Sequence, residues 1–74
     1  MQKRQVRLGT QAQIHQQLAG FLNKKINIVM NDSTVLLTEL IRISGDELLV
    51  QNMRQRKHSI RVSEIYEIII DIND

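Results

Sequence analysis

The sequence predicts a small, mainly β domain in which an N-terminal α-helix precedes a strongly bent, five-stranded antiparallel sheet. The chain has only 74 residues, which leaves room for a single domain. Its apolar residues change from helical spacing to strict alternation near residue 25. Short turn signals then recur between the alternating segments, and the chain contains no proline.

The first residues differ from the rest of the chain. Residues 1–9 are polar and basic and show no periodicity, so we expect a flexible basic arm ahead of a folded domain at residues 10–74. The net charge is only +2, from ten Lys and Arg against eight Asp and Glu. A second basic block lies at residues 54–58, whereas acidic residues gather near the end. A local basic patch is therefore expected on a nearly neutral protein.

A helix is expected to begin after Thr10, whose hydroxyl can accept from a free backbone amide. Gln13 stands where the reciprocal partner of a capping box belongs. The helix should end near Asn23, and Gly20 lowers its intrinsic stability, so we expect it to form by docking on the sheet. Its apolar residues share one face: Ile14, Leu18, Phe21 and Leu22.

Five strands are expected after the helix, and the alternation of apolar and polar residues locates them. The turns between them contain Asn, Asp, Ser and Gly, which tolerate turn conformations. The second strand carries apolar residues on both faces, which indicates burial on two sides or a strong bend. The element order is typical of a small, SH3-like barrel. The strands are expected at about residues 25–30, 34–43, 47–53, 58–62 and 65–72.

Composition argues against several classes of protein. No apolar run approaches the length of a membrane-spanning helix, and no signal peptide is evident, so we expect a cytoplasmic protein without a membrane partner. The absence of cysteine excludes disulfides and cysteine-rich zinc sites. Two separate histidines do not make a metal site, and we expect no cofactor and no metal.

No catalytic arrangement is evident, so we expect that the protein is not an enzyme and has no small-molecule substrate. Ser59 follows His58, but consecutive strand residues point to opposite faces of a sheet. A nucleophile and its base would therefore be separated. The three glycines are scattered and form no phosphate-binding loop.

The basic stretch at residues 54–57 is the best candidate for binding. Arg54, Arg56 and Lys57 can contact phosphates, or they can form a solvated hairpin tip. Arg61 can stack on a base or hold a carboxylate through its planar guanidinium. Tyr66 can stack on a base if exposed, or pack on a strand face.

Residues 11–72 resemble the Sm-like family, including its bacterial branch Hfq. The likeness rests on the leading helix, the five-strand meander, a long second strand, and a break of a few residues before the last strand. The segment at residues 60–68 looks like the second Sm motif. Arg61 falls on the family's arginine, whereas Val62 replaces its glycine.

The resemblance implies a homo-hexamer or heptamer in which the fourth expected strand of one subunit pairs with the fifth of the next. It also implies binding of single-stranded RNA, with Arg61 at the pore, and a role in post-transcriptional regulation. An isoleucine-rich last strand independently favours such pairing, because an open apolar edge invites aggregation. Two alternatives remain: an assembly or protein-interaction module that does not bind RNA, and a monomeric accessory domain.

Overall fold

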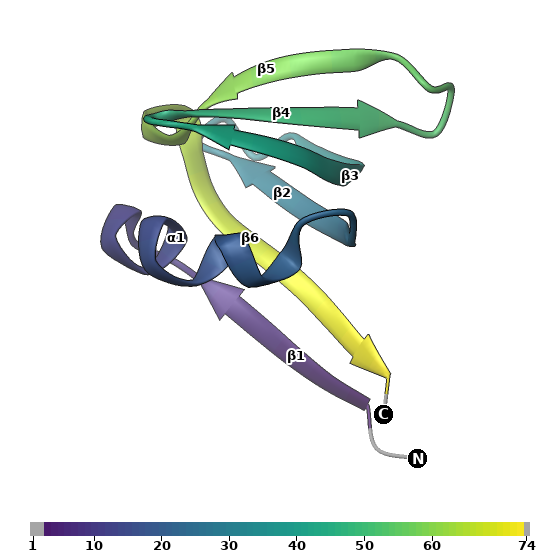
Figure 1. The fold of residues 1–74 in the computed structure, drawn as a ribbon. Coiled ribbons are helices and arrows are strands. Elements are labelled where there is room, and N and C mark those ends of the chain that lie inside the picture. Colours follow the sequence, from purple (N-terminus) through teal and green to yellow (C-terminus); the bar gives the residue numbers. More distant parts are fainter. Residues whose placement is uncertain (1–2, 74) are drawn as a thin grey trace.

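The computed structural model describes residues 3–73 and shows a mainly β fold, with six antiparallel strands in one open sheet and a short helix (Figure 1). The strands are β1 (Lys3–Leu8), β2 (Lys25–Met30), β3 (Val35–Ser44), β4 (Glu47–Asn52), β5 (Lys57–Arg61) and β6 (Ile65–Asn73). The helical elements are α1 (Gln11–Gln17) and two 3₁₀ segments, η1 (Leu18–Phe21) and η2 (Val62–Glu64).

The strand order across the sheet is β1-β6-β2-β3-β4-β5. Five of these strands lie close to the ranges expected from alternation, but the prediction of five strands is wrong because β1 adds a sixth. The small, SH3-like barrel expected from the element order is not closed. The end strands β1 and β5 do not pair with each other, so the sheet is open and has two edges.

The segment expected to be a flexible arm is largely a strand. Residues 3–8 pair antiparallel with β6, in a register that places Val6 opposite Ile70 and Leu8 opposite Ile68. Leu8 is buried in the core. With only two apolar residues among six, this segment gives a weak sequence signal for a strand. The strand forms because β6 supplies backbone hydrogen-bond partners and apolar contacts. Residues 1 and 2 lie outside the described part.

The start of α1 confirms the expected N-cap. The Thr10 hydroxyl accepts from the Gln13 backbone N–H at 3.1 Å. The Gln13 side chain reaches back one residue further than in a standard capping box and accepts from the Gly9 N–H at 2.9 Å. The α-helix gives way to η1 at Leu18, and Asn23 follows in a left-handed conformation with φ 65°, which ends the helical segment.

A bend in β3 accounts for its apolar residues on both faces. The register with β4 shifts between Leu40 and Arg42, which leaves Ile41 as an extra, bulged residue. Such a bulge increases the local twist and turns the side chains that follow it. A second irregularity, between Val29 and Met30, bends β2 against β6. The two together curve the sheet around one face.

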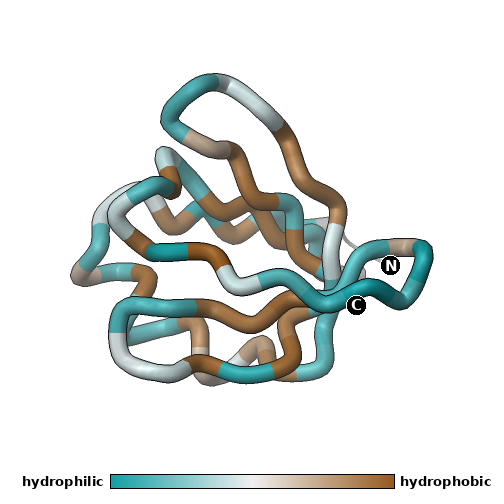
Figure 2. Tube along the Cα trace, turned by 90° about the horizontal axis from the view of Figure 1, so that it is seen from above, coloured by the Kyte–Doolittle hydropathy of each residue, from teal (hydrophilic) through white to brown (hydrophobic). Residues whose placement is uncertain are grey.

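The core lies on the inner face of this curve, where α1 packs beside β1 and η2 (Figure 1). Hydrophobic segments follow the strands, and hydrophilic segments follow the turns (Figure 2). The core combines Leu8, Ile14, Leu18, Ile26, Ile28, Leu40, Leu48, Val50, Ile60, Val62, Ile65, Ile68 and Ile70. Among residues 3–73, no helix is long and apolar enough to cross a membrane.

Candidate nucleic-acid interface and the adjoining cleft

The basic residues between β4 and β5 stand on a turn that one side chain organises. The Asn52 Oδ1 atom accepts from the backbone N–H groups of Arg54 and Arg56, at 2.9 and 3.0 Å. Gln55 adopts a positive φ of 63° and donates its N–H to the Asn52 carbonyl at 2.9 Å. The turn is therefore hydrogen-bonded throughout, and Arg54 and Arg56 extend from a defined backbone.

Four cations follow this turn and the strand after it. Arg54, Arg56 and Lys57 are exposed at the tip, and Arg61 is exposed at the far end of β5. Four residues of strand, or about 13 Å, separate Lys57 from Arg61. Within the described residues, none of the four has a carboxylate partner within ion-pair distance. The three cations at the tip are therefore available to an outside anion, whereas Arg61 lies directly across the β4–β5 ladder from Glu47.

The strand β5 has an open edge. It pairs only with β4, in a register that places Val50 opposite His58 and Leu48 opposite Ile60. The bonds at both ends of this ladder, Asn52 N–H to Arg56 and Val62 N–H to Asp46, fix which backbone groups face β4. By alternation, the backbone groups of residues 57, 59 and 61 face outward. This edge offers main-chain donors and acceptors beside the cations.

The structure does not bring Tyr66 to this group. Tyr66 lies near the start of β6, beyond η2, and is 65 % exposed. It does not line the cleft described next. Phe21, the other aromatic residue, packs against the core as expected. Aromatic stacking would therefore depend on a single exposed residue that does not line the cleft.

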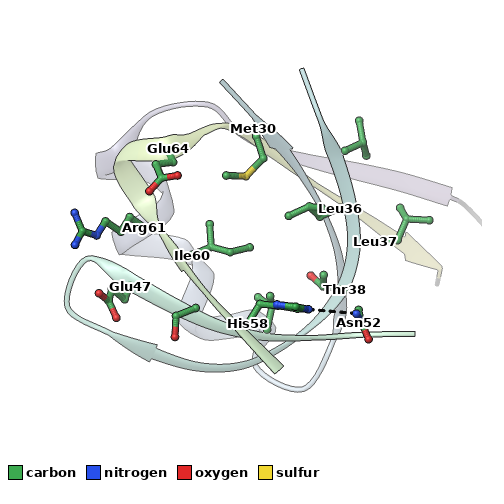
Figure 3. Close-up of a pocket in the computed structure, with 13 residues that line it drawn as sticks. Met30, Leu36, Leu37, Thr38, Glu47, Asn52, His58, Ile60, Arg61 and Glu64 are labelled. Atoms are coloured by element: carbon green, nitrogen blue, oxygen red, sulfur yellow. Dashed lines mark hydrogen bonds between the residues drawn. The ribbon is translucent and has the colours of Figure 1, made fainter. Parts of the chain in front are cut away.

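An open cleft of about 560 Å³ lies on the inner face of the sheet between β5 and β3 (Figure 3). Met30, Leu36 and Ile60 form its apolar walls. Thr38, Asn52 and His58 form its polar side, from three adjacent strands. Arg61, Glu47 and Glu64 lie at one end, where the Arg61 guanidinium points away from the centre (Figure 3).

The most unusual group in this cleft is the hydroxyl of Thr38. The side chain is only 8 % exposed, and its Oγ1 atom is buried without any hydrogen-bond partner. An unsatisfied buried hydroxyl costs about 1–3 kcal/mol of stability. Thr38 lies directly opposite Asn52 in the sheet. The sequence thus keeps a polar atom where an apolar residue of the same size would fit the fold better.

The orientation of the Asn52 amide follows from its hydrogen bonds. Its Oδ1 atom already accepts two backbone N–H groups, so the Nδ2 atom faces the His58 Nε2 atom, at 3.3 Å. An amide nitrogen only donates, so Nε2 accepts, and the proton of a neutral His58 ring is on Nδ1. The polar side of the cleft is therefore rich in donors.

Sequence reasoning missed Thr38, Asn52 and His58 as residues of one site. The sequence does contain a signal for Thr38 and another for Asn52, but each involves only a few positions. Thr38 interrupts the alternating run of Leu36 and Leu40 on the buried face of β3, and Asn52 ends a strand just before a turn. Neither pattern tells which strands become neighbours. The cleft exists because β3, β4 and β5 lie side by side and the sheet remains open.

β6 is paired on both edges, each over part of its length. β2 pairs with residues 65–69 and β1 with residues 68–73. The expected ring joins the fourth predicted strand, which is β5, to the last strand of the next subunit, which is β6. Such a ring requires β1 to leave its place or to become the pairing strand itself. The free edges of β1 and β5 both carry basic residues, which disfavours direct pairing between them.

A second, smaller hollow of about 380 Å³ is lined by polar side chains that include Lys25, Asn27, Glu39 and Gln51. No three His, Asp or Glu side chains in the described part of the chain stand close enough to hold a metal ion. His15 lies 3.3 Å from Asp46, which ties α1 to the β3–β4 turn at the surface. Arg7 and Glu67 form a similar contact at 3.3 Å between β1 and β6. Both contacts link elements of the fold.

No family model, curated protein sequence or solved structure gives a significant match to this chain.

Proposed function

We propose that this protein binds single-stranded RNA through the basic turn between β4 and β5 and through Arg61. The observation that carries the proposal is the set of four exposed cations without carboxylate partners, held on one hydrogen-bonded turn and one edge strand. The proposed location is the cytoplasm, and the proposed role is regulatory and not catalytic.

The arrangement suits a flexible phosphate backbone. Arg54, Arg56 and Lys57 can neutralise phosphates at the tip, and Arg61 can contact a phosphate or a base further along β5. Single-stranded RNA can follow this curved path because its unpaired backbone is pliable and its bases are free to turn away. The nearly neutral net charge limits binding elsewhere on the surface.

The test is the salt dependence of binding to a fluorescently labelled, mixed-sequence 12-nucleotide RNA, measured by anisotropy. Each phosphate contact to a single strand contributes about 0.7 to the slope of log K against log salt. Replacing Arg54 and Arg56 together by alanine should therefore lower that slope by about 1.4. The matched control is Arg4→Ala with Arg7→Ala, which removes two exposed cations of β1, the strand at the opposite edge of the sheet from β5.

The proposal fails if the wild-type protein does not bind the oligonucleotide, or if binding is insensitive to salt. Equal loss of slope in both double variants would also contradict it, because net charge and not the turn would then govern affinity.

A second candidate function is an assembly or protein-interaction module, in an Sm-like ring or in another oligomer. The open edge of β5 favours it, since unpaired strand edges readily add a strand from another chain. Exposed apolar side chains on the outer face of β3, Val35 and Leu37, also favour a covered surface. A ring would additionally require the rearrangement of β1.

Native mass spectrometry without prior nuclease treatment separates these candidates. A six- or seven-fold species supports the ring, and extra mass that ribonuclease removes supports RNA binding. Recovery of protein partners that resist ribonuclease, from a protein that fails the anisotropy test, would favour the interaction module.

A further inference from the structure

We propose that the cleft between β3 and β5 is a nucleobase site, which receives one unstacked base between Leu36 and Ile60 and bonds its edge through Thr38 and Asn52. In its RNA form this inference rests on the function proposed above. It also stands alone, because a free nucleoside would present the same chemistry.

The Thr38 hydroxyl is the first reason. Its oxygen is buried and has no hydrogen-bond partner within the protein, and Thr38 is one of the residues that line the cleft. A purely apolar ligand would leave the hydroxyl unsatisfied and would gain nothing from it. A polar atom of a ligand that reaches the floor of the cleft would satisfy the hydroxyl.

The shape and chemistry of the walls are the second reason. Leu36 and Ile60 lie on either side of the open space, with Met30 above them and Thr38 and His58 below (Figure 3). A ligand with apolar faces and a polar edge fits such a site, and a base has both. The cleft has ample room, with about 560 Å³.

The fixed orientation of Asn52 is the third reason, and it predicts a preference. The Oδ1 atom is fully used by backbone N–H groups, so the amide can offer only its Nδ2 donor. The tautomer of His58 leaves another donor on Nδ1. A wall of donors favours bases that present carbonyl oxygens, such as uracil and cytosine, over adenine, whose acceptors N1 and N7 lie beside the N6 amino donor.

Position links the cleft to the basic surface. His58 and Ile60 face the cleft from β5, while Lys57 and Arg61 flank them on the same strand. A strand of RNA that follows these cations can turn a base inward past the open edge. This route also compensates for a basic surface that has few aromatic residues, because a base held in a cleft does not need an exposed stacking platform.

The test is a titration of ¹⁵N-labelled protein with uridine, cytidine and adenosine, followed by NMR at two salt concentrations. We expect uridine and cytidine to shift amide signals of Thr38, Asn52 and Ile60 independently of salt, and adenosine to do so less. Thr38→Val should weaken uridine binding about fivefold, the worth of one hydrogen bond. Ser44→Ala is the matched control, since Ser44 is an exposed hydroxyl of β3 outside the cleft.

A thermal melt separates binding from folding. Thr38→Val should keep or raise the melting temperature while it weakens binding, because the valine removes an unsatisfied polar atom. A variant that loses both stability and binding would overturn the inference, since Thr38 would then be structural.

Four further outcomes test the proposed nucleobase site and its base preference. RNA binding that Thr38→Val leaves unchanged, with no nucleoside shifts at the cleft, overturns this inference but leaves RNA binding intact. Nucleoside binding without RNA binding supports the cleft for a free nucleoside and refutes the proposed function. Equal affinity for all three nucleosides refutes the preference derived from Asn52. Tighter binding of phenol or indole than of any nucleoside overturns the inference in favour of an aromatic side chain of a partner protein.

Discussion

The two halves of the inner face of the sheet differ in how completely they are closed. Beneath α1, Ile14 and Leu18 are buried against Leu8 and the strands β2 and β6. Beside β5, the same face opens into a cleft whose walls are only partly covered and where Thr38 has no partner. The closed half supplies the stability of the domain, and the open half retains polar groups that folding does not need.

This division is informative because small domains have little stability to spare. A chain of this size that leaves a hydroxyl unsatisfied and apolar residues such as Met30 and Leu36 only half-buried gives up stability in one place. Stability lost at a single place, away from the main core, is a common mark of a binding site.

The strongest test of the comparison is a truncation in each half. Leu18→Ala removes a fully buried side chain under the helix and should cost about 2–5 kcal/mol. Leu36→Ala removes a partly exposed side chain from the cleft wall and should cost about 1 kcal/mol, because less surface returns to water. Urea denaturation followed by circular dichroism measures both. Equal costs would show that the two halves are packed alike.

A smaller effect of opposite sign is expected at Thr38. Thr38→Val should stabilise the fold by about 1 kcal/mol, since the cost of the unsatisfied hydroxyl is removed. For a domain of this length, that change corresponds to a rise in melting temperature of about 4–8 °C. Calorimetry in the absence of ligand gives the value. A fall in melting temperature would mean that the Thr38 hydroxyl has a hydrogen-bond partner in the folded protein.

The smallest effect concerns the turn between β2 and β3, at the rim of the cleft. The Thr34 backbone N–H donates to the Asp32 carboxylate at 3.0 Å and lowers the pKa of Asp32 below its ordinary value of 3.8. A lowered pKa means that the ionised carboxylate stabilises the fold above pH 4 and that this contribution is lost as the pH falls through the folded value. Because Asp32 is fully exposed, the loss should be slight.

The measurement for this turn is a comparison of urea midpoints at neutral pH and at pH 3. The drop in midpoint should be slightly smaller in Asp32→Asn than in the wild-type protein, because the variant has no carboxylate to protonate. An identical pH dependence in the two proteins would show that the Thr34 contact does not stabilise the turn.

Local patterns in the sequence were enough to predict most elements of the fold. Alternation located β2 to β6, and the Thr10 cap located the start of α1, because both depend on neighbours in sequence. β1 was missed because its pairing partner is at the other end of the chain and its own six residues contain few apolar groups. The bulge at Ile41 was expected only as a bend in an apolar strand.

The candidate site was predicted less completely. Arg54, Arg56 and Lys57 could be selected from charge alone, and they do occupy a hairpin tip. Whether they and Arg61 bind RNA stays a prediction. The cleft could not be predicted, because it depends on Thr38 of β3 and His58 of β5 being separated by one strand in a sheet that does not close.

The pairing of Lys3 with Asn73 has a consequence for the order of folding. This contact joins positions that are nearly the whole chain apart, so β1 can dock only after β6 has been made and placed. During synthesis, β1 therefore waits while β2 to β5 assemble, and the isoleucine-rich edge of β6 is briefly uncovered. In that interval the β1 strand of one chain can pair with β6 of another chain. The rate of synthesis and the local concentration of chains would then determine how often two molecules exchange strands.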